Sequence, residues 1–262
     1  MALSVPITLT TDFGLRDPFA GILKGVILAI NPEARLVDLT HGVESFDILD
    51  AALALGQSYP HFPAGTIHVV VVDPGVGSAR RPILVSTRHG HFVGPDNGVF
   101  ELVYERESPF EVRHLTADRY FKKPVSTTFH GRDIFAPVAA WLSTGIAPES
   151  LGKPITDYAR LEVAKPERVS PALMRGLVLR VDKFGNLITN FKPEDVTAGV
   201  SLCLLINERS VTRLVTSYAA GRRGEVFAIV GSAGFLEIAA SRASAAELLN
   251  ARPGTEVRLV LN

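Results

Sequence analysis

The stretch TIHVVVVDPGVGSARR, residues 66–81, decides the fold class. It opens with a near-continuous β-branched run, which is typical of a central parallel strand covered on both faces. The run ends at Asp73, turns through two glycines and then presents Arg80 and Arg81. Such a strand predicts polar groups at the carboxyl edge of a sheet, where open α/β folds bind their ligands.

Strand and helix patterns alternate on both sides of this stretch. Residues 7–12 and 34–40 are predicted strands, residues 83–98 a strand pair, and residues 17–30, 46–59, 99–105 and 130–145 predicted helices. Asp17 followed by Pro18 predicts a helix start, because aspartate caps free amides and proline fits the first turn. The first two-thirds of the chain therefore predicts a mostly parallel α/β sandwich.

The rhythm changes near EVAKPERVSPA, residues 162–172, where two prolines and scattered charges predict a linker. Six short β-rich segments follow, which favours a small antiparallel β-barrel. We therefore expect an α/β domain over residues 1–162, a linker over 163–170 and a barrel domain over 171–262.

Composition points to a small-molecule partner. With 27 basic and 27 acidic side chains the formal net charge is zero, which removes the argument for a nucleic-acid or anionic membrane surface. Cys203 is the only cysteine, so a reducing compartment is expected. The start MALSVPITLT lacks a signal-peptide pattern and no apolar run reaches membrane-spanning length, so we predict a cytoplasmic protein.

Carboxylates and an arginine are predicted to meet at one edge of the sheet. Asp12 and Asp73 each end a predicted parallel strand, and Asp17 follows nearby. Arg80 is close enough to Asp73 for the loop to fold it back over the same pocket, whereas Arg81 is expected to face solvent. The plain alternative is that each aspartate only starts a turn or caps a helix.

His130 stands just before a predicted helix, where its imidazole could reach the same edge, although a capping role is equally ordinary for histidine. The other histidines show no zinc-binding spacing, so we expect no metal. The glycine-rich turn after Asp73 matches neither GxxxxGK[ST] nor GxGxxG, and no GxSxG motif occurs.

Two further stretches place polar or small residues among apolar ones. DKFGNLITNF, residues 182–191, contains Asp182, Asn186 and Asn190, and Asn186 could read a base edge or simply form a hairpin turn. GSAGFLEIA, residues 231–239, offers approachable backbone amides, although a tight strand connection explains it as well.

Together, TTDFG, HGVESFD, VVVVDPGVGSARR, GPDNGVF, TTFHGRDIFAPVAA, DKFGNLITN and GSAGFLEIA resemble the S-adenosylmethionine (SAM) hydroxide adenosyltransferase family, a relative of the bacterial fluorinase and chlorinase. The resemblance runs in order from Thr10 to about Ala239. It implies a homotrimer whose ligand site lies between the barrel of one subunit and the α/β domain of its neighbour. It also implies hydrolysis of SAM to adenosine and L-methionine, with no cofactor.

The resemblance assigns roles to individual residues. The family's catalytic aspartate, arginine and histidine match Asp73, Arg80 and His130. Asp12 matches a carboxylate on the ribose hydroxyls and Asp17 one at the methionine ammonium. The remaining matches are aromatic rings beside adenosine at Phe46, Phe184 and Tyr218, an adenine-reading amide at Asn186, groups at the amino-acid end at Asp182 and Ser232, and backbone near the base at Arg242.

Departures from the halogenase pattern favour water as the nucleophile. Asp73 and His130 replace tyrosines, and Gly131 replaces a halide-holding serine. Asp73 would repel a halide but can accept a hydrogen bond from water, while Arg80 and a donating His130 would stabilise hydroxide character during attack on ribose C5′. Ala233 replaces an arginine, which leaves the methionine carboxylate without an assigned partner.

Two other functions fit parts of the pattern. One is a binding module that senses SAM or adenosine, which would not need the full set of Asp73, Arg80 and His130. The other is a metal-dependent phosphohydrolase that uses Asp12, Asp17 and Asp73.

Overall fold

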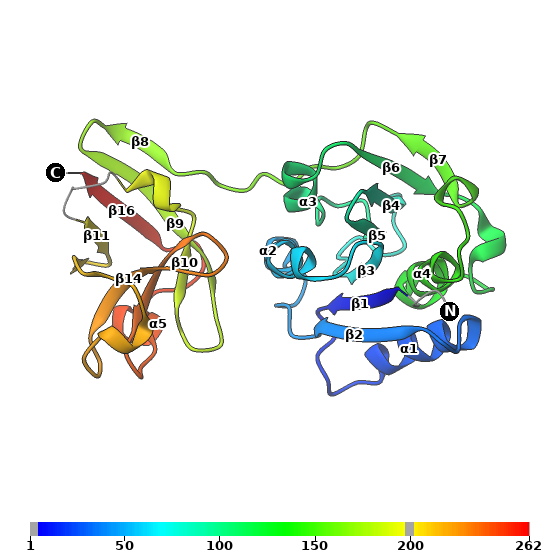
Figure 1. The fold of residues 1–262 in the computed structure, drawn as a ribbon, viewed down its shortest axis with the longest axis horizontal. Helices are drawn as coiled ribbons and strands as arrows, with labels where there is room; N and C mark the ends of the chain where they lie inside the picture. The colour runs from blue at the N-terminus through cyan, green and yellow to red at the C-terminus, as the bar shows by residue number, and fades with distance from the viewer. Residues whose placement is uncertain (1–4, 197–201, 262) are drawn as a thin grey trace. The chain divides into compact units, whose positions relative to one another are not determined.

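A computed structural model describes residues 5–196 and 202–261 of the chain. Contacts divide the chain into two compact units, one ending at Glu162 and the other beginning at Val163. Each unit has its own sheet and its own apolar core, and each is described separately (Figure 1).

The amino-terminal unit is built on a mixed, largely parallel sheet of seven strands within the described residues. Their order is β2-β1-β3-β5-β4-β6-β7, and β2, β1, β3 and β5 run parallel to one another. The strands are β1 (Pro6–Thr11), β2 (Arg35–Thr40), β3 (Thr66–Val71), β4 (Pro82–Thr87), β5 (Gly90–Pro95), β6 (Phe110–Leu115) and β7 (Gly152–Ile155). The predicted α/β class is confirmed.

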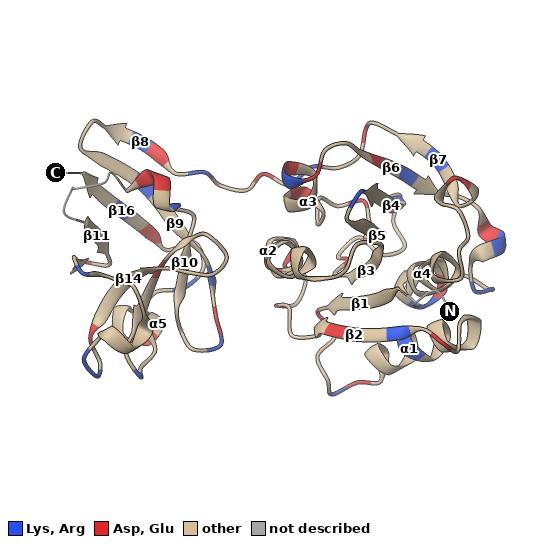
Figure 2. Cartoon of the chain, in the orientation of Figure 1, with Lys and Arg blue, Asp and Glu red and all other residues tan. Residues whose placement is uncertain are grey.

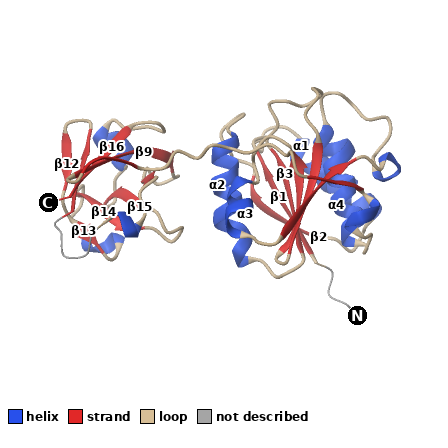
Figure 3. Cartoon of the chain, turned by 90° about the horizontal axis from the view of Figure 1, so that it is seen from above, coloured by secondary structure: helices blue, strands red, loops and turns tan. Residues whose placement is uncertain are grey.

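Helices cover both faces of this sheet (Figure 3). Helices α1 (Phe19–Ile30) and α4 (Ala136–Ser143) lie on one face, and α2 (Ile48–Ser58) and α3 (Glu101–Arg106) on the other. The β-branched run explains why β3 is central. Val69 and Val71 enter the core under α1 and α4, whereas Val70 and Val72 enter the core on the other face.

Shorter helical turns connect these elements. They are η1 (Tyr59–His61), η2 (Asp118–Tyr120), η3 (Gly131–Phe135) and η4 (Pro148–Ser150) in the amino-terminal unit, and η5 (Pro193–Asp195) and η6 (Tyr218–Ala220) in the other. The turn η3 is a single turn of π-helix that runs directly into α4.

The predicted capping role of Asp17 is wrong. Helix α1 begins at Phe19, Pro18 holds the capping position, and no side chain caps the helix. Asp17 therefore lies one residue too early to reach the free amides of the first turn. In α2, by contrast, the Asp47 side chain does accept the backbone N–H of Asp50, at 2.9 Å.

The carboxyl-terminal unit is an antiparallel sheet that curls into a half-barrel, which confirms the predicted β class. Within the described residues the strand order is β12-β11-β16-β9-β10-β15-β14-β13, with β8 beside β9 and one parallel pair between β13 and β14. The strands are β8 (Glu167–Ser170), β9 (Leu173–Val181), β10 (Leu187–Thr189), β11 (Leu202–Ile206), β12 (Arg209–Val211), β13 (Leu214–Val215), β14 (Val226–Val230), β15 (Leu236–Ala240) and β16 (Glu256–Leu261), and the helix is α5 (Ala245–Leu249).

Strand β8 occupies part of the stretch that the sequence predicts to be a linker. Glu167–Ser170 pairs with β9, and the Glu167 carboxylate forms an ion pair with Arg175 at 2.6 Å. Only residues 163–166 of the predicted linker therefore lie outside the β elements.

Strand β15 shows the alternation expected of a strand between two apolar layers. Leu236, Ile238 and Ala240 belong to the main core of the unit, while Ala239 belongs to a smaller apolar cluster on the opposite face. Glu237 also points to that opposite face, since successive side chains of a strand alternate.

Charges of both signs are interspersed over both units (Figure 2). No helix within residues 5–196 and 202–261 is long and apolar enough to cross a membrane.

Candidate active site

The carboxyl edge of the amino-terminal sheet carries the predicted polar residues. Asp12 follows β1, Asp73 follows β3, and both line a pocket of about 280 Å³, here called the amino-terminal pocket. Predicted residues Phe46 and His130 line it too. The other lining residues are Phe13, Phe19, Ser45, Val71, Val76, Thr128, Phe129 and Gly131.

Asp73 and Arg80 form a buried ion pair beside this pocket. The Arg80 Nε donates to Asp73 Oδ1 at 2.9 Å and to Oδ2 at 3.0 Å, and Nη2 also donates to Oδ2. The side chains are only 5% and 8% exposed. A fork-shaped contact of this kind fixes the orientation of both groups.

The loop between Asp73 and Arg80 can return so sharply because residue 77 is glycine. Gly77 has a φ of +77°, and a Cβ there would lie 2.2 Å from the Thr127 carbonyl oxygen. The Val76 N–H donates to the Asp73 carbonyl at 3.2 Å, and the Arg80 N–H to Ser78 Oγ at 3.2 Å. The loop therefore delivers the guanidinium back to the end of β3.

His130 completes a chain of three side chains. Arg80 Nη2 lies 2.7 Å from His130 Nδ1. Because a guanidinium can only donate, Nδ1 must accept, and the ring proton is then on Nε2. Burial and the neighbouring Arg80 charge lower the pKa of His130. The imidazole is thus neutral near pH 7 and keeps one N–H to donate.

This arrangement makes a prediction for solution spectroscopy. In a nitrogen-15 NMR titration, His130 should show the Nε2–H tautomer and should gain its second proton only below the ordinary histidine pKa of about 6.5. Free imidazole added to the same sample serves as the comparison. Protonation of His130 at or above the pH at which that reference titrates would contradict the assigned hydrogen bond.

Arg80 retains one unused donor. Its Nη1 is buried and has no hydrogen-bond partner among the described residues. The guanidinium also lies over the buried ring of Phe135, 5.3 Å from the ring centroid. A buried donor without a partner is costly, so Nη1 is able to donate a hydrogen bond to a small polar molecule that reaches it.

The rest of the pocket is mainly aromatic. The rings of Phe13, Phe19 and Phe129 meet edge to face, with centroids 5.5 to 5.8 Å apart. Asp12 Oδ2 accepts the backbone N–H of Phe46 at 2.9 Å, and this bond holds Phe46 at a left-handed φ of +67° with its ring exposed. The wall is apolar apart from a few fixed polar groups.

Gly131 brings the backbone close to the end of β3. A Cβ on residue 131 would lie 2.8 Å from Val71 Cγ1 and 3.4 Å from Leu23 Cδ2. A side chain here would require Val71 to move, so the space beside His130 depends on this glycine.

The sequence predicts that Arg81 faces solvent, but in the structure its side chain is bound to other residues. Its Nε donates to Asp96 at 2.9 Å, and its Nη1 and Nη2 donate to the carboxylate and carbonyl oxygens of Asp157 at 2.8 and 2.7 Å. Arg81 therefore has different partners from Arg80 and ties the start of β4 to the chain near Asp157.

A second group of predicted residues meets in the carboxyl-terminal unit. Asp182, Phe184, Asn186, Tyr218 and Arg242 line a pocket of about 560 Å³ with Ala240 and Ala243, here called the carboxyl-terminal pocket. Phe184 is 76% exposed and presents its ring to this space.

A tight turn fixes the amide of Asn186. Asp182 Oδ1 accepts the backbone N–H groups of Phe184 and Asn186 at 2.8 and 2.9 Å, and Oδ2 accepts Asn186 Nδ2 at 2.8 Å. Gly185 has a φ of +82°. The hairpin-turn interpretation is therefore correct. In this turn the bond from Asn186 Nδ2 to Asp182 also fixes the direction in which Asn186 Oδ1 points.

Three residues singled out in the sequence lie elsewhere. Asp17 and Ser232 are exposed and line neither pocket. Asn190 is buried and structural, since its Oδ1 accepts Leu177 N–H at 2.9 Å and its Nδ2 donates to the Ala164 carbonyl at 3.0 Å.

Sequence reasoning missed Glu237, which accepts a hydrogen bond from the Tyr218 hydroxyl at 2.9 Å. The available signal was a charge inside the apolar run GFLEIAA.

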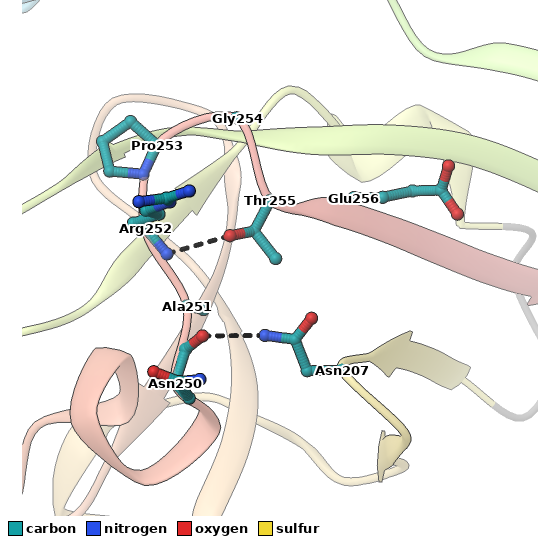
Figure 4. Close-up of a pocket in the computed structure, with 8 residues that line it drawn as sticks. All are labelled: Asn207, Asn250, Ala251, Arg252, Pro253, Gly254, Thr255 and Glu256. Atoms are coloured by element: carbon teal, nitrogen blue, oxygen red, sulfur yellow. Dashed lines mark hydrogen bonds between the residues drawn. The ribbon is translucent and has the colours of Figure 1, made fainter.

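A third pocket contains none of the predicted site residues. It is formed by Asn207 and the loop from Asn250 to Glu256, where Asn207 donates to the Asn250 carbonyl and the Arg252 N–H donates to Thr255 Oγ1 (Figure 4). No cluster of three or more histidine, cysteine, aspartate or glutamate side chains suited to a metal occurs in the described part of the chain.

A two-domain chain with an Asp–Arg–His cluster at the carboxyl edge of its α/β sheet matches an established family. Residues 7–152 match the SAM hydroxide adenosyltransferase N-terminal domain, and residues 176–258 match the C-terminal domain of the same family. The chain belongs to the SAM hydroxide adenosyltransferase family.

Relatives and solved structures agree with this membership. The (R)-S-adenosyl-L-methionine hydrolase of Thermus thermophilus is 38% identical over 97% of this chain and 99% of its own length. A fluorinase of Actinoplanes is 25% identical over 96% of each chain. The crystal structure of an uncharacterized conserved protein from Thermotoga maritima superposes with a TM-score of 0.90 at 36% identity, over 97% of this chain and 99% of that one.

Proposed function

We propose that this protein hydrolyses S-adenosyl-L-methionine to adenosine and L-methionine, in the (R) form named for the Thermus relative. The observation that carries the proposal is the hydrogen-bonded chain from Asp73 through Arg80 to His130, with an unused guanidinium donor beside it. A binding module would not need these three groups in contact.

In the proposed reaction one water molecule attacks ribose C5′ in line with the C5′–S bond. The bond between the water oxygen and C5′ forms as the C5′–S bond breaks, and its electron pair returns to sulfur to give neutral methionine thioether. One water proton is lost to solvent by way of Asp73. Holding water and C5′ in this geometry can supply up to about 7–11 kcal/mol of the barrier.

Each of the three side chains would have its own role in orienting and activating that water. Asp73 accepts a hydrogen bond and fixes the direction of the oxygen lone pair. Arg80 Nη1 and His130 Nε2–H donate, and so stabilise the developing hydroxide character. Because the positive charge of the sulfonium and the negative charge of the hydroxide disappear together, an aromatic, poorly hydrated pocket favours the reaction.

The two pockets suit different parts of the substrate. Asp12 in the amino-terminal pocket suits the ribose hydroxyls, and Phe184 and Asn186 in the other suit the adenine ring and its hydrogen-bonding edge. We further propose that the chain forms a homotrimer in which the barrel of one subunit and the α/β domain of its neighbour share each site. We also propose that the protein acts in the cytoplasm, because its single cysteine, Cys203, is consistent with a reducing compartment.

The phosphohydrolase alternative is disfavoured by the contacts of the carboxylates. Asp17 lies outside the pocket that holds Asp12 and Asp73. The positive charge of Arg80, in contact with Asp73, also opposes a metal cation at that carboxylate.

The proposed function predicts a specific product with a specific label. Purified protein incubated with (R)-SAM in oxygen-18 water should form adenosine that carries the heavy oxygen at O5′, together with methionine, as measured by chromatography and mass spectrometry. The (S) epimer at sulfur serves as the matched substrate control, and a reaction with added halide tests for a competing nucleophile. Unlabelled adenosine would exclude the displacement by water, and tight binding with no product would favour the sensing module.

A further inference from the structure

A carboxylate lies in an unusual position in the carboxyl-terminal unit. Glu237 is only 7% exposed and is the second residue of β15, paired in register with Ile188 of β10 and Ile229 of β14. Its neighbours on that face of the sheet include Ile229 and Ala239. A buried carboxylate among apolar side chains is costly unless it has a partner.

The only hydrogen-bond partner of the Glu237 side chain in the described residues is a phenol. The Tyr218 hydroxyl donates to Oε2 at 2.9 Å. Oε1 lies against Gly231, where a Cβ would be only 1.8 Å away, so the carboxylate fits because this residue has no side chain. No lysine, arginine or histidine forms an ion pair with Glu237 in that part of the chain.

The surroundings of Glu237 are acidic. Burial raises the pKa of Glu237, and the charge of Asp182 raises it further, which the hydrogen bond from Tyr218 partly offsets. Burial and Glu237 raise the pKa of Tyr218 to about 12. Asp182 and Tyr218 both line the carboxyl-terminal pocket. A nearby positive charge would therefore relieve an electrostatic cost that the free protein carries.

We propose that Glu237 is a positioning residue that acts through Tyr218 and makes the carboxyl-terminal pocket select a cationic ligand. The single proton of the Tyr218 hydroxyl is committed to Glu237, so the phenol oxygen can only accept. A hydroxyl polarised by a carboxylate is a strong acceptor for an N–H donor, and the negative end of its dipole attracts a neighbouring sulfonium charge. This inference rests on the proposed function, because SAM carries a net positive charge whereas its product adenosine is uncharged.

The test compares the binding of a charged and an uncharged ligand to the full-length protein. Isothermal titration in an Asp73→Asn background, in which the substrate survives, gives the dissociation constants of SAM and adenosine. Glu237→Gln keeps the shape of the side chain and should weaken SAM about tenfold while changing adenosine less than about twofold. Tyr218→Phe should likewise weaken the binding of SAM more than that of adenosine. The double variant should bind SAM no more weakly than Tyr218→Phe alone.

The matched control is Glu194→Gln, which removes one negative charge from an exposed position of the same unit and should change neither constant. Equal weakening of both ligands, or unchanged SAM binding in Glu237→Gln and in Tyr218→Phe, would overturn the inference. These outcomes are separate from the proposed function. Wild-type protein that binds SAM without hydrolysing it would refute hydrolysis and leave the charge selection intact.

Discussion

Asp73→Asn is expected to slow adenosine formation from SAM by about 10²- to 10⁴-fold while leaving the dissociation constant of SAM within a few-fold of the wild-type value. The amide keeps the shape of the carboxylate and can still accept from Arg80 Nε. It cannot, however, take a proton from the attacking water, and it leaves the Arg80 charge without its counter-charge. Single-turnover kinetics followed by chromatography measure the chemical step directly.

The control for this change is Asp118→Asn, which removes an exposed carboxylate of the same unit that forms an ion pair with Lys123. Thermal unfolding of both variants shows whether the fold survives, because breaking a buried ion pair can cost about 3–5 kcal/mol. A folded Asp73→Asn protein with an unchanged rate would remove Asp73 from the reaction. A folded variant that no longer binds SAM would make Asp73 a binding group instead.

Mixing two inactive variants should restore activity if neighbouring subunits share each site. One variant is Asp73→Asn, which damages the amino-terminal pocket, and the other carries Phe184→Ala and Asn186→Ala, which damage the carboxyl-terminal pocket. In randomly mixed trimers about a quarter of the sites would combine two intact pockets. Co-expressed and purified mixed oligomers should therefore regain up to about a quarter of wild-type activity.

The same variants mixed without subunit exchange provide the control for this experiment and should stay inactive. Mass spectrometry of the intact oligomer identifies which mixed species formed. Mixed trimers without any recovered activity would contradict a shared site. A monomeric protein with full activity would contradict the trimer itself.

Much of the site could be predicted because the signals are local. Asp73 ends a strand whose β-branched run can only be buried, and the loop that follows is too short to carry Arg80 far away. His130 precedes a helical turn at the same edge of the sheet. Asp182 and Asn186 are within one turn, so their contact follows from turn chemistry.

The sequence predictions fail for residues whose role depends on tertiary contacts. Asp17 has the right residue type for a cap, but the helix begins at Phe19. The role of Arg81 depends on Asp157, far away in the sequence. Glu237 is visible in the sequence as a charge inside an apolar run, but its partner, Tyr218, approaches from a separate turn that the sequence does not place beside it.

The close approach of Gly131 to Val71 has an evolutionary consequence. Any descendant of this chain that acquires a larger residue at position 131 would place it against the Val71 methyl group, so the change carries a packing cost until Val71 shifts or is replaced. A paired change at positions 71 and 131 would therefore be tolerated better than a change at 131 alone. The packing beneath this glycine would then limit which nucleophiles such enzymes come to use.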